Sequence, residues 1–220
     1  MDCIENRIFV YNYAFTFFLT LPLLHVVLLL SSPKTFTGEL LYSGIKVTPI
    51  DSNAIEKILI YAKDSLGKVI HFSTILGKQE CINNLSRNKS ILLVETTKGK
   101  FAIKTGNQNE SDTSFTYRYK KTLGSKKIAG IRAKKMLVYF NNLDKPFPFY
   151  YTKKINAKYG PSFHKLPGLV VSYYQPTDHG MFRFELTEWN KKEIPLTLFS
   201  VPKDYQRVTL DEFFELINQP

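Results

Sequence analysis

Residues 170–189, with the sequence VVSYYQPTDHGMFRFELTEW, decide the class of fold. Residues 170–174 and 181–189 are rich in β-branched and aromatic side chains, which suit the pleated surface of a sheet. Between them lie Pro176, Asp178 and Gly180, residue types that favour a tight turn. The segment therefore predicts a β-hairpin, in which Asp178 and His179 belong to the turn.

Comparable segments continue along most of the chain. Apolar and aromatic residues predict further strands at residues 36–45, 58–62, 69–72, 91–95, 100–104, 115–119, 136–140 and 147–152. Thr97-Lys98-Gly99 predicts a short hairpin, because glycine supplies the positive φ that such turns need. Residues 106–114 (GNQNESDTS) lack apolar periodicity and predict a polar loop.

Three local patterns add detail to the predicted strands. Ile58, Ile60 and Ala62 alternate onto one face, and the β-branched residues favour a strand over a helix at 53–62. Gly67 is expected to separate this strand from the next. The clearest half-buried strand is 115–120, where aromatic and polar residues alternate.

One helix is expected, at the C-terminus. Thr209 is a favourable N-cap, and Asp211 and Glu212 suit the first turn of a helix. An apolar stripe follows, made of Leu210, Phe213, Phe214 and Ile217. We expect this helix to lie on an open face of the sheet.

Together these elements predict a β-rich α+β fold with an antiparallel sheet and a C-terminal helix. The strands follow one another without the long helical crossovers that a parallel sheet requires. No internal repeat or second domain boundary is visible, so residues 33–220 are expected to form a single β-rich domain.

The composition excludes several classes of protein. With 220 residues, 44% of them hydrophobic and 14% aromatic, the chain can bury a real core and is not mainly disordered. Two cysteines exclude a disulfide scaffold and any four-cysteine zinc site. The net charge of +11 favours anionic partners, such as an anionic membrane surface. Pairs of lysines beside strands are also typical of solvated strand ends.

Residues 1–32 are interpreted as a targeting segment. Residues 14–30 (AFTFFLTLPLLHVVLLL) carry no formal charge and precede the polar residues Ser31-Ser32-Pro33-Lys34. A cleaved signal peptide and an uncleaved N-terminal membrane anchor both fit, and a buried soluble helix is the third alternative. Either of the first two predicts an exported protein, periplasmic or associated with the outer membrane. Cys81 is then the only cysteine of the domain, which suits a small half-buried apolar side chain.

The sequence lacks the usual catalytic motifs. It contains no Gly-x-Ser-x-Gly elbow, no phosphate-binding glycine loop and no His-Glu-x-x-His. His71, His164 and His179 lie far apart in the sequence, so no metal site and no cofactor is predicted. A hydrolase that uses His164 or His179 remains a minor alternative. The basic and aromatic alternation at 115–121 also describes one buried and one solvated sheet face, and nucleic-acid binding is not expected.

Three segments carry a family resemblance. Residues 160–171 (GPSFHKLPGLVV) resemble the signature of the GLPGLI family of exported Bacteroidetes proteins. Residues 126–135 (KKIAGIRAKK) resemble a strand opening of that family and of a related exported domain of unknown function. Residues 201–209 (VPKDYQRVT) resemble the closing segment of the related domain. The three segments occur in the usual order.

The resemblance implies a fold like that of periplasmic lipoprotein carriers, in which a curved half-barrel sheet holds apolar groups on its concave face. The family has no agreed activity. The family-motif residues here are Gly160, Pro161, Leu166, Pro167, Gly168 and Leu169. The two prolines exclude a central strand at this point, so the motif is either a structural corner or a loop at the mouth of a ligand cavity.

These observations predict an exported, non-enzymatic binding module for a lipid, an acyl chain or a hydrophobic polypeptide. The candidate cavity wall consists of Phe115, Tyr117, Tyr119, Phe147, Phe149, Tyr151 and Tyr173. Lys153 and Lys154 are candidates for the rim, where they would meet anionic headgroups. The main alternative is a structural or interaction protein of the cell envelope with a filled core. An empty apolar concavity above about 300 Å³ favours the carrier, and a packed interior favours the interaction protein.

Overall fold

A computed structural model describes residues 35–48, 50–74, 77–105, 117–141, 143–160, 163 and 166–218. Contacts divide the chain into two units, Met1–Lys34 and Thr35–Pro220, and all the described residues belong to the second. The targeting segment predicted at residues 1–32 lies outside them, as does the polar loop at 106–114. Among the described residues, no helix combines the length and the apolar character needed to cross a membrane.

The described part of the chain is mostly sheet. Its strands are β1 (Thr37–Thr48), β2 (Ile50–Lys63), β3 (Leu66–Ser73), β4 (Gly77–Asn84), β5 (Lys89–Thr96), β6 (Gly99–Thr105), β7 (Tyr117–Ile128), β8 (Ile131–Phe140), β9 (Phe147–Thr152), β10 (Leu169–Thr177), β11 (Gly180–Asn190) and β12 (Gln206–Val208). Two 3₁₀ turns, η2 (Ala157–Tyr159) and η3 (Leu196–Phe199), and the helix α3 (Leu210–Asn218) complete it.

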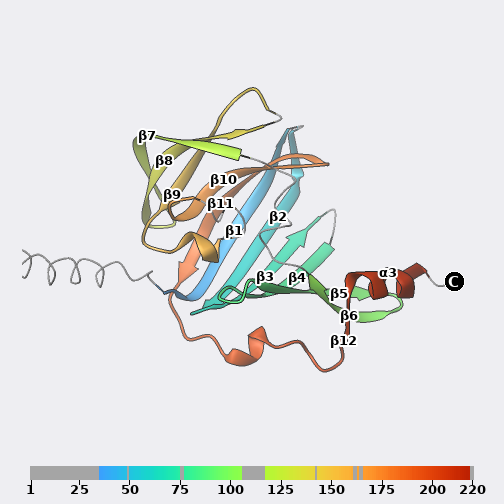
Figure 1. Cartoon of the computed structure of the whole chain (residues 1–220). Coiled ribbons are helices and arrows are strands. Elements are labelled where there is room, and N and C mark those ends of the chain that lie inside the picture. The colour runs from blue at the N-terminus through green and yellow to red at the C-terminus, as the bar shows by residue number, and fades with distance from the viewer. Residues whose placement is uncertain are drawn as a thin grey trace, which may run out of the picture. The chain divides into compact units, whose positions relative to one another are not determined.

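All these strands form one curved, open sheet in the order β12-β6-β5-β4-β3-β2-β1-β11-β10-β9-β8-β7 (Figure 1). Strands β1 to β6 are one antiparallel meander and β7 to β11 are another, and pairing of β1 with β11 joins them. The predicted β-rich α+β fold with an antiparallel sheet and a C-terminal helix is confirmed.

Most of the local predictions hold, because hairpins are encoded by neighbouring residues. The hairpin predicted from residues 170–189 is present as β10 and β11, and β2 is a strand at 53–62. The prediction for Gly67 is wrong. Gly67 lies within β3, opposite Ala62, and the chain reverses at Asp64, which adopts a φ of 53°.

Strand β7 differs from its prediction as a half-buried strand. It is an edge strand paired only with β8 among the described strands, and most of its described side chains are exposed. The lysine-rich sequence of β7 suits this place, because charged side chains protect an edge from unwanted pairing.

The C-terminal segment passes over both faces of one end of the sheet. After β11 it leads through η3 to β12, which pairs with β6 as a short parallel strand, and then to α3 (Figure 1). This parallel pair departs from the all-antiparallel prediction. Phe101 and Ile103 pack against α3, whereas Ala102, on the opposite face of β6, belongs to a cluster that contacts Phe199 and Val201.

The predicted helix begins as expected, but its buried stripe differs. The amide of Glu212 donates to the Thr209 hydroxyl at 3.2 Å, and the amide of Thr209 donates to the Glu212 carboxylate at 2.7 Å. Phe213 and Leu216 face the sheet, whereas Leu210 and Phe214 are each 49% exposed. The predicted stripe was wrong for these two residues, because the helix packs only on the narrow edge formed by β6 and β12.

The main core lies on one face of the sheet, which we call the inner face and define by Tyr42, Tyr173 and Phe184. The opposite face is called the outer face. Alternation along the strands puts Ile58, Ile60 and Ala62 on the inner face, where they are buried as predicted.

Candidate functional site

Part of the predicted ligand wall lies on the inner face, where it forms a packed aromatic cluster. Phe149, Tyr173 and Phe184 are almost completely buried. The rings of Tyr173 and Phe184 stack with centroids 5.1 Å apart, and Tyr42 meets Tyr173 edge-on at 6.0 Å. Such ring pairs add to the burial of apolar area, so the cluster stabilises this half of the sheet.

Phe163 fills the centre of this cluster. Its ring centroid lies 5.0 Å from Phe149, 5.1 Å from Tyr117 and 5.5 Å from Tyr173. Phe163 comes from the loop between η2 and β10 and has a φ of 65°, which is rare for a bulky residue. The loop therefore inserts a side chain into the space that a ligand of the concave face would occupy. This residue was not predicted from the sequence, although an aromatic residue between two prolines and near two glycines was a usable signal.

The family-motif residues support this insertion. Leu166 and Leu169 are buried in the same core, and Pro167 is half-buried. A Cβ atom at Gly168 would lie 2.2 Å from the carbonyl oxygen of Thr152, so only glycine lets the loop approach β9 this closely. Gly160 is buried directly after η2, and Pro161 lies outside the described residues. These positions fit the structural-corner interpretation of the motif.

The other candidate residues are dispersed. Tyr117 and Phe147 are half-buried at the margin of the cluster, and Tyr151 is buried within it. Tyr119 is 39% exposed on the edge strand, and Phe115 lies outside the described residues. Lys153 and Lys154 are exposed directly after β9, as a rim position requires. Of the predicted wall, the structure thus brings Tyr117, Phe149 and Tyr173 together around Phe163.

Two hollows in the described part of the chain are small. One, which we call the η2 hollow, has a volume of about 160 Å³ and lies between η2 and strands β2 to β4. The other has about 230 Å³ and lies beside the start of α3, where Lys104, Arg207 and Glu212 meet Ile91, Ala102 and Val208. Both are smaller than the roughly 300 Å³ at which pockets for drug-sized ligands begin.

A buried carboxylate lies on the inner face beside the aromatic cluster. Glu56 is 7% exposed, and its Oε2 atom lies 2.8 Å from Nε2 of His71. The hydroxyl of Ser73 donates to Oε1 of Glu56 at 3.0 Å. The acid thus lies between the serine and the histidine, whereas in a nucleophilic triad the histidine lies between the other two. Their strands are neighbours, and the register of β2 with β3 puts Glu56 opposite Ser73.

The histidines of the minor hydrolase alternative lie elsewhere. His179 is exposed in the turn between β10 and β11, where its amide donates to the Thr177 hydroxyl. His164 lies outside the described residues. Within the described ranges, no group of three or more His, Cys, Asp or Glu residues could hold a metal ion.

The hydroxyl of Tyr173 is buried and has no hydrogen-bond partner among the described residues. Burial raises the pKa of this phenol well above its usual value, and the nearby Tyr42 and Glu56 add to the effect. We expect Tyr173→Phe to stabilise the fold by about 1 to 2 kcal/mol, because it removes an unsatisfied polar group and keeps the ring stack. Urea unfolding measures the change. A loss of stability would mean that the hydroxyl has a partner in solution.

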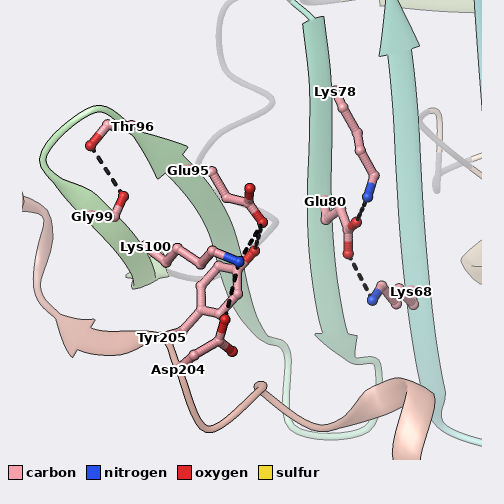
Figure 2. A network of polar contacts seen from close by, with 9 residues as sticks. All are labelled: Lys68, Lys78, Glu80, Glu95, Thr96, Gly99, Lys100, Asp204 and Tyr205. Atoms are coloured by element: carbon pink, nitrogen blue, oxygen red, sulfur yellow. Dashed lines mark hydrogen bonds and ion pairs between the residues drawn. The ribbon is translucent and has the colours of Figure 1, made fainter.

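On the outer face, ion pairs hold the C-terminal segment and neighbouring strands (Figure 2). Lys100 lies 3.1 Å from Asp204 and 3.6 Å from Glu95, and the Tyr205 hydroxyl donates to Glu95 at 2.6 Å. Next to them, Glu80 lies between Lys68, at 2.7 Å, and Lys78. Figure 2 shows Glu80 pointing at both lysines along β3 and β4. The arrangement is structural, because each charge already has a partner.

Glu80 should make the stability of the fold depend on pH. Burial alone would raise the pKa of its carboxyl, but hydrogen bonds and charges from Lys68 and Lys78 outweigh burial and lower it. Because the folded-state pKa is below the unfolded-state value, the carboxylate stabilises the fold at neutral pH. That stabilisation is lost as the pH falls below about 4.5 and through the folded-state pKa.

We therefore expect Glu80→Gln to lower the free energy of unfolding at pH 7 by about 1 to 3 kcal/mol, because Lys68 stays buried without its partner. The variant should lose less stability than the parent chain between pH 5 and pH 3. Urea unfolding at several pH values measures both effects. Parallel pH profiles for the two proteins would contradict this role of Glu80.

The outer face of β1 to β3 carries exposed apolar side chains. Ile45, Ile55 and Phe72 are 39%, 46% and 42% exposed. Together with the half-buried Leu41, Leu59 and Ile70 they form what we call the outer patch. Lys57 lies among them on β2, opposite Phe72, and Arg183 lies opposite Ile45. Several exposed apolar side chains gathered on one sheet face are typical of an interaction surface.

Comparisons with known proteins support the fold alone. No protein-family model matches the chain, and no curated protein matches it. A solved structure of PNGF-II resembles it with a TM-score of 0.50 and 17% sequence identity, over 83% of this chain and 33% of PNGF-II. The chain thus spans about a third of the length of PNGF-II. The GLPGLI resemblance stays a prediction.

Proposed function

We propose that the protein is an exported, non-enzymatic interaction module of the cell envelope, with a filled core and the outer patch as its contact surface. The observation that carries this proposal is Phe163, which occupies the centre of the aromatic cluster on the inner face. The buried residues of the predicted lipid-binding wall are thereby used in internal packing. An interaction protein needs no ligand cavity. The exposed apolar side chains of the outer patch would form its contact surface.

The chemistry of the outer patch indicates the kind of partner. Its apolar side chains favour contact with another apolar surface, and Lys57 and Arg183 add positive charge to it. Neither has an ion-pair partner among the described residues. A second copy of this chain would bring like charges together, since the net charge is +11. The partner is therefore a polypeptide with an apolar surface that also carries acidic side chains.

Site-specific cross-linking in the native host tests this surface. A photoreactive amino acid at Ile55 or Phe72 should give a discrete adduct with one envelope protein. The same group at Leu123, which is 97% exposed on β7, is the matched control and should give none. Adding Lys57→Glu should remove the adduct from the Phe72 position, because it reverses the charge in the patch. Equal labelling at Leu123, or adducts only with a second copy of the chain, would refute the proposal.

Export rests on the apolar segment at residues 14–30. The mass of the protein isolated from its host tests this part separately. A chain that begins near residue 33 supports a cleaved signal, and a full-length chain in the membrane fraction supports an anchor. Full-length protein in the cytosolic fraction would contradict export.

A further inference from the structure

The η2 hollow is not used by the interaction surface, which lies on the outer face. Its walls come from the inner face of β2, β3 and β4, from Leu85, and from Lys158, Tyr159 and Gly160 of the η2 segment. The η2 segment is held in place by the Tyr159 hydroxyl, which donates to the carbonyl oxygen of Asp64 at 2.6 Å. This hydrogen bond joins the η2 segment to the turn between β2 and β3, beside the hollow.

The size and lining of the η2 hollow suit a small apolar group. Its volume is about 160 Å³, and half of its lining residues are Ile60, Ala62, Gly67, Val69 and Leu85. An engineered, enclosed cavity of about 150 Å³ lined by Leu, Ile and Phe binds benzene. The η2 hollow has a similar volume, is partly open and adds polar groups to an apolar wall. The hollow therefore fits an apolar body of about six carbon atoms and is too small for a lipid.

The polar groups of the hollow are suited to an anion. Asn83 is 6% exposed, and its Oδ1 atom accepts a hydrogen bond from the Cys81 thiol at 3.1 Å. Its amide nitrogen has no hydrogen-bond partner among the described residues. The ammonium group of Lys158 lies 4.9 Å from the centroid of the Tyr159 ring and pairs with no carboxylate in the described part of the chain.

Among the described residues that line the hollow, none carries a negative charge that would compete for these donors. Lys158 is the only formally charged residue in its lining. Burial raises the pKa of the Cys81 thiol to about 11, so Cys81 is neutral at physiological pH. A carboxylate in the hollow would meet one ammonium group and one amide, and hydrogen bonds to charged groups are stronger than neutral ones.

We propose that the η2 hollow is a binding site for a small carboxylic acid with a single apolar ring or a short apolar chain. The apolar body packs against Ile60 and Val69, and the carboxylate contacts Lys158 and the amide of Asn83. The site is separate from the outer patch, so either proposal can fail while the other stands.

Gly67 offers a way to close the site. A Cβ atom there would lie 3.7 Å from Cβ of Asn83 and 4.0 Å from Leu85, which is ordinary van der Waals contact. Gly67→Val therefore fits the strand and puts two methyl groups into the hollow. Lys158→Met removes the charge and keeps most of the apolar stem. Lys154→Met is the matched control, because Lys154 is an exposed lysine four residues earlier in the chain and does not line the hollow.

The test is a titration of the full chain with benzoate and with benzyl alcohol, its neutral analogue. We expect saturable binding of benzoate, which Lys158→Met weakens about tenfold and Lys154→Met leaves unchanged. Benzyl alcohol should bind more weakly than benzoate does. Its affinity should be the same for the parent chain and for Lys158→Met. Gly67→Val should abolish binding of both compounds. No saturable benzoate binding up to about 10 mM, or equal effects of the two lysine variants, would overturn the proposal.

A second measurement does not depend on the folding of Gly67→Val. In a Cys3→Ser background, Cys81 is the only thiol of the chain and lines the hollow. Benzoate should slow its alkylation in the folded protein in proportion to the occupancy found by titration. An alkylation rate that benzoate leaves unchanged at saturating concentration would place the acid elsewhere and refute this site.

Discussion

Replacing Phe163 with alanine should cost about 4 kcal/mol of unfolding free energy, the largest effect of any single change considered. The ring lies between 5.0 and 5.5 Å from the rings of Phe149, Tyr117 and Tyr173. Its removal leaves an apolar void, because the sheet that carries these neighbours cannot collapse onto the empty space. Chemical denaturation of the two proteins measures the difference.

Tyr119→Ala is the matched control for this experiment. Tyr119 was predicted to line the same wall as Phe149 and Tyr173, the neighbours of Phe163, but it is 39% exposed on the edge strand β7. Its removal should change the unfolding free energy by less than about 1 kcal/mol. Equal losses for the two variants, or a loss below about 1 kcal/mol for Phe163→Ala, would mean that Phe163 does not fill the inner face.

The second large effect is expected from Gly168→Ala, which should destabilise the fold by about 3 kcal/mol. The added Cβ would lie 2.2 Å from the carbonyl oxygen and 2.8 Å from the carbonyl carbon of Thr152. Both atoms belong to the backbone at the end of β9, so the strand itself must move. The φ of Gly168 is not in the left-handed region, so the cost arises from contact and not from backbone strain. Thermal and chemical unfolding both report it.

Gly67→Ala is the control for this substitution. It adds the same methyl group within a strand, where the nearest atom is 3.7 Å away. Alanine also restricts the conformations of the unfolded chain more than glycine does. This variant should therefore be neutral or slightly stabilising. If the two alanine variants had the same stability, the close approach of the loop to β9 would not exist in solution.

The sequence was sufficient for most of the strands, because their signals are local. The alternation of Ile58, Ile60 and Ala62 and the turn at Asp178 act within a few residues. Contacts between segments that are distant in the sequence could not be predicted from such local patterns. Whether Leu210 and Phe214 of α3 are buried depends on the narrow edge formed by β6 and β12, and β12 pairs in parallel only because the C-terminal segment returns to that edge.

The candidate site was predicted in part. Alternation along β9 and β10 was enough to expect Phe149, Tyr151 and Tyr173 on one apolar face, and they are buried there. It could not show what fills that face, because Phe163 reaches it from a loop with a φ of 65°. The pair of Glu56 and His71 was also missed. The two residues are 15 apart in sequence and meet only through the register of β2 with β3.

Native mass spectrometry of the protein isolated gently from its host tests the central claim most directly, namely that the inner face is filled by the chain itself. We predict the mass of the protein without a lipid, and no uptake of added phospholipid. Phe163→Ala, which opens the inner face, serves as the comparison. A lipid-sized mass on the parent protein that is lost on organic extraction would contradict the filled core and support a lipid carrier.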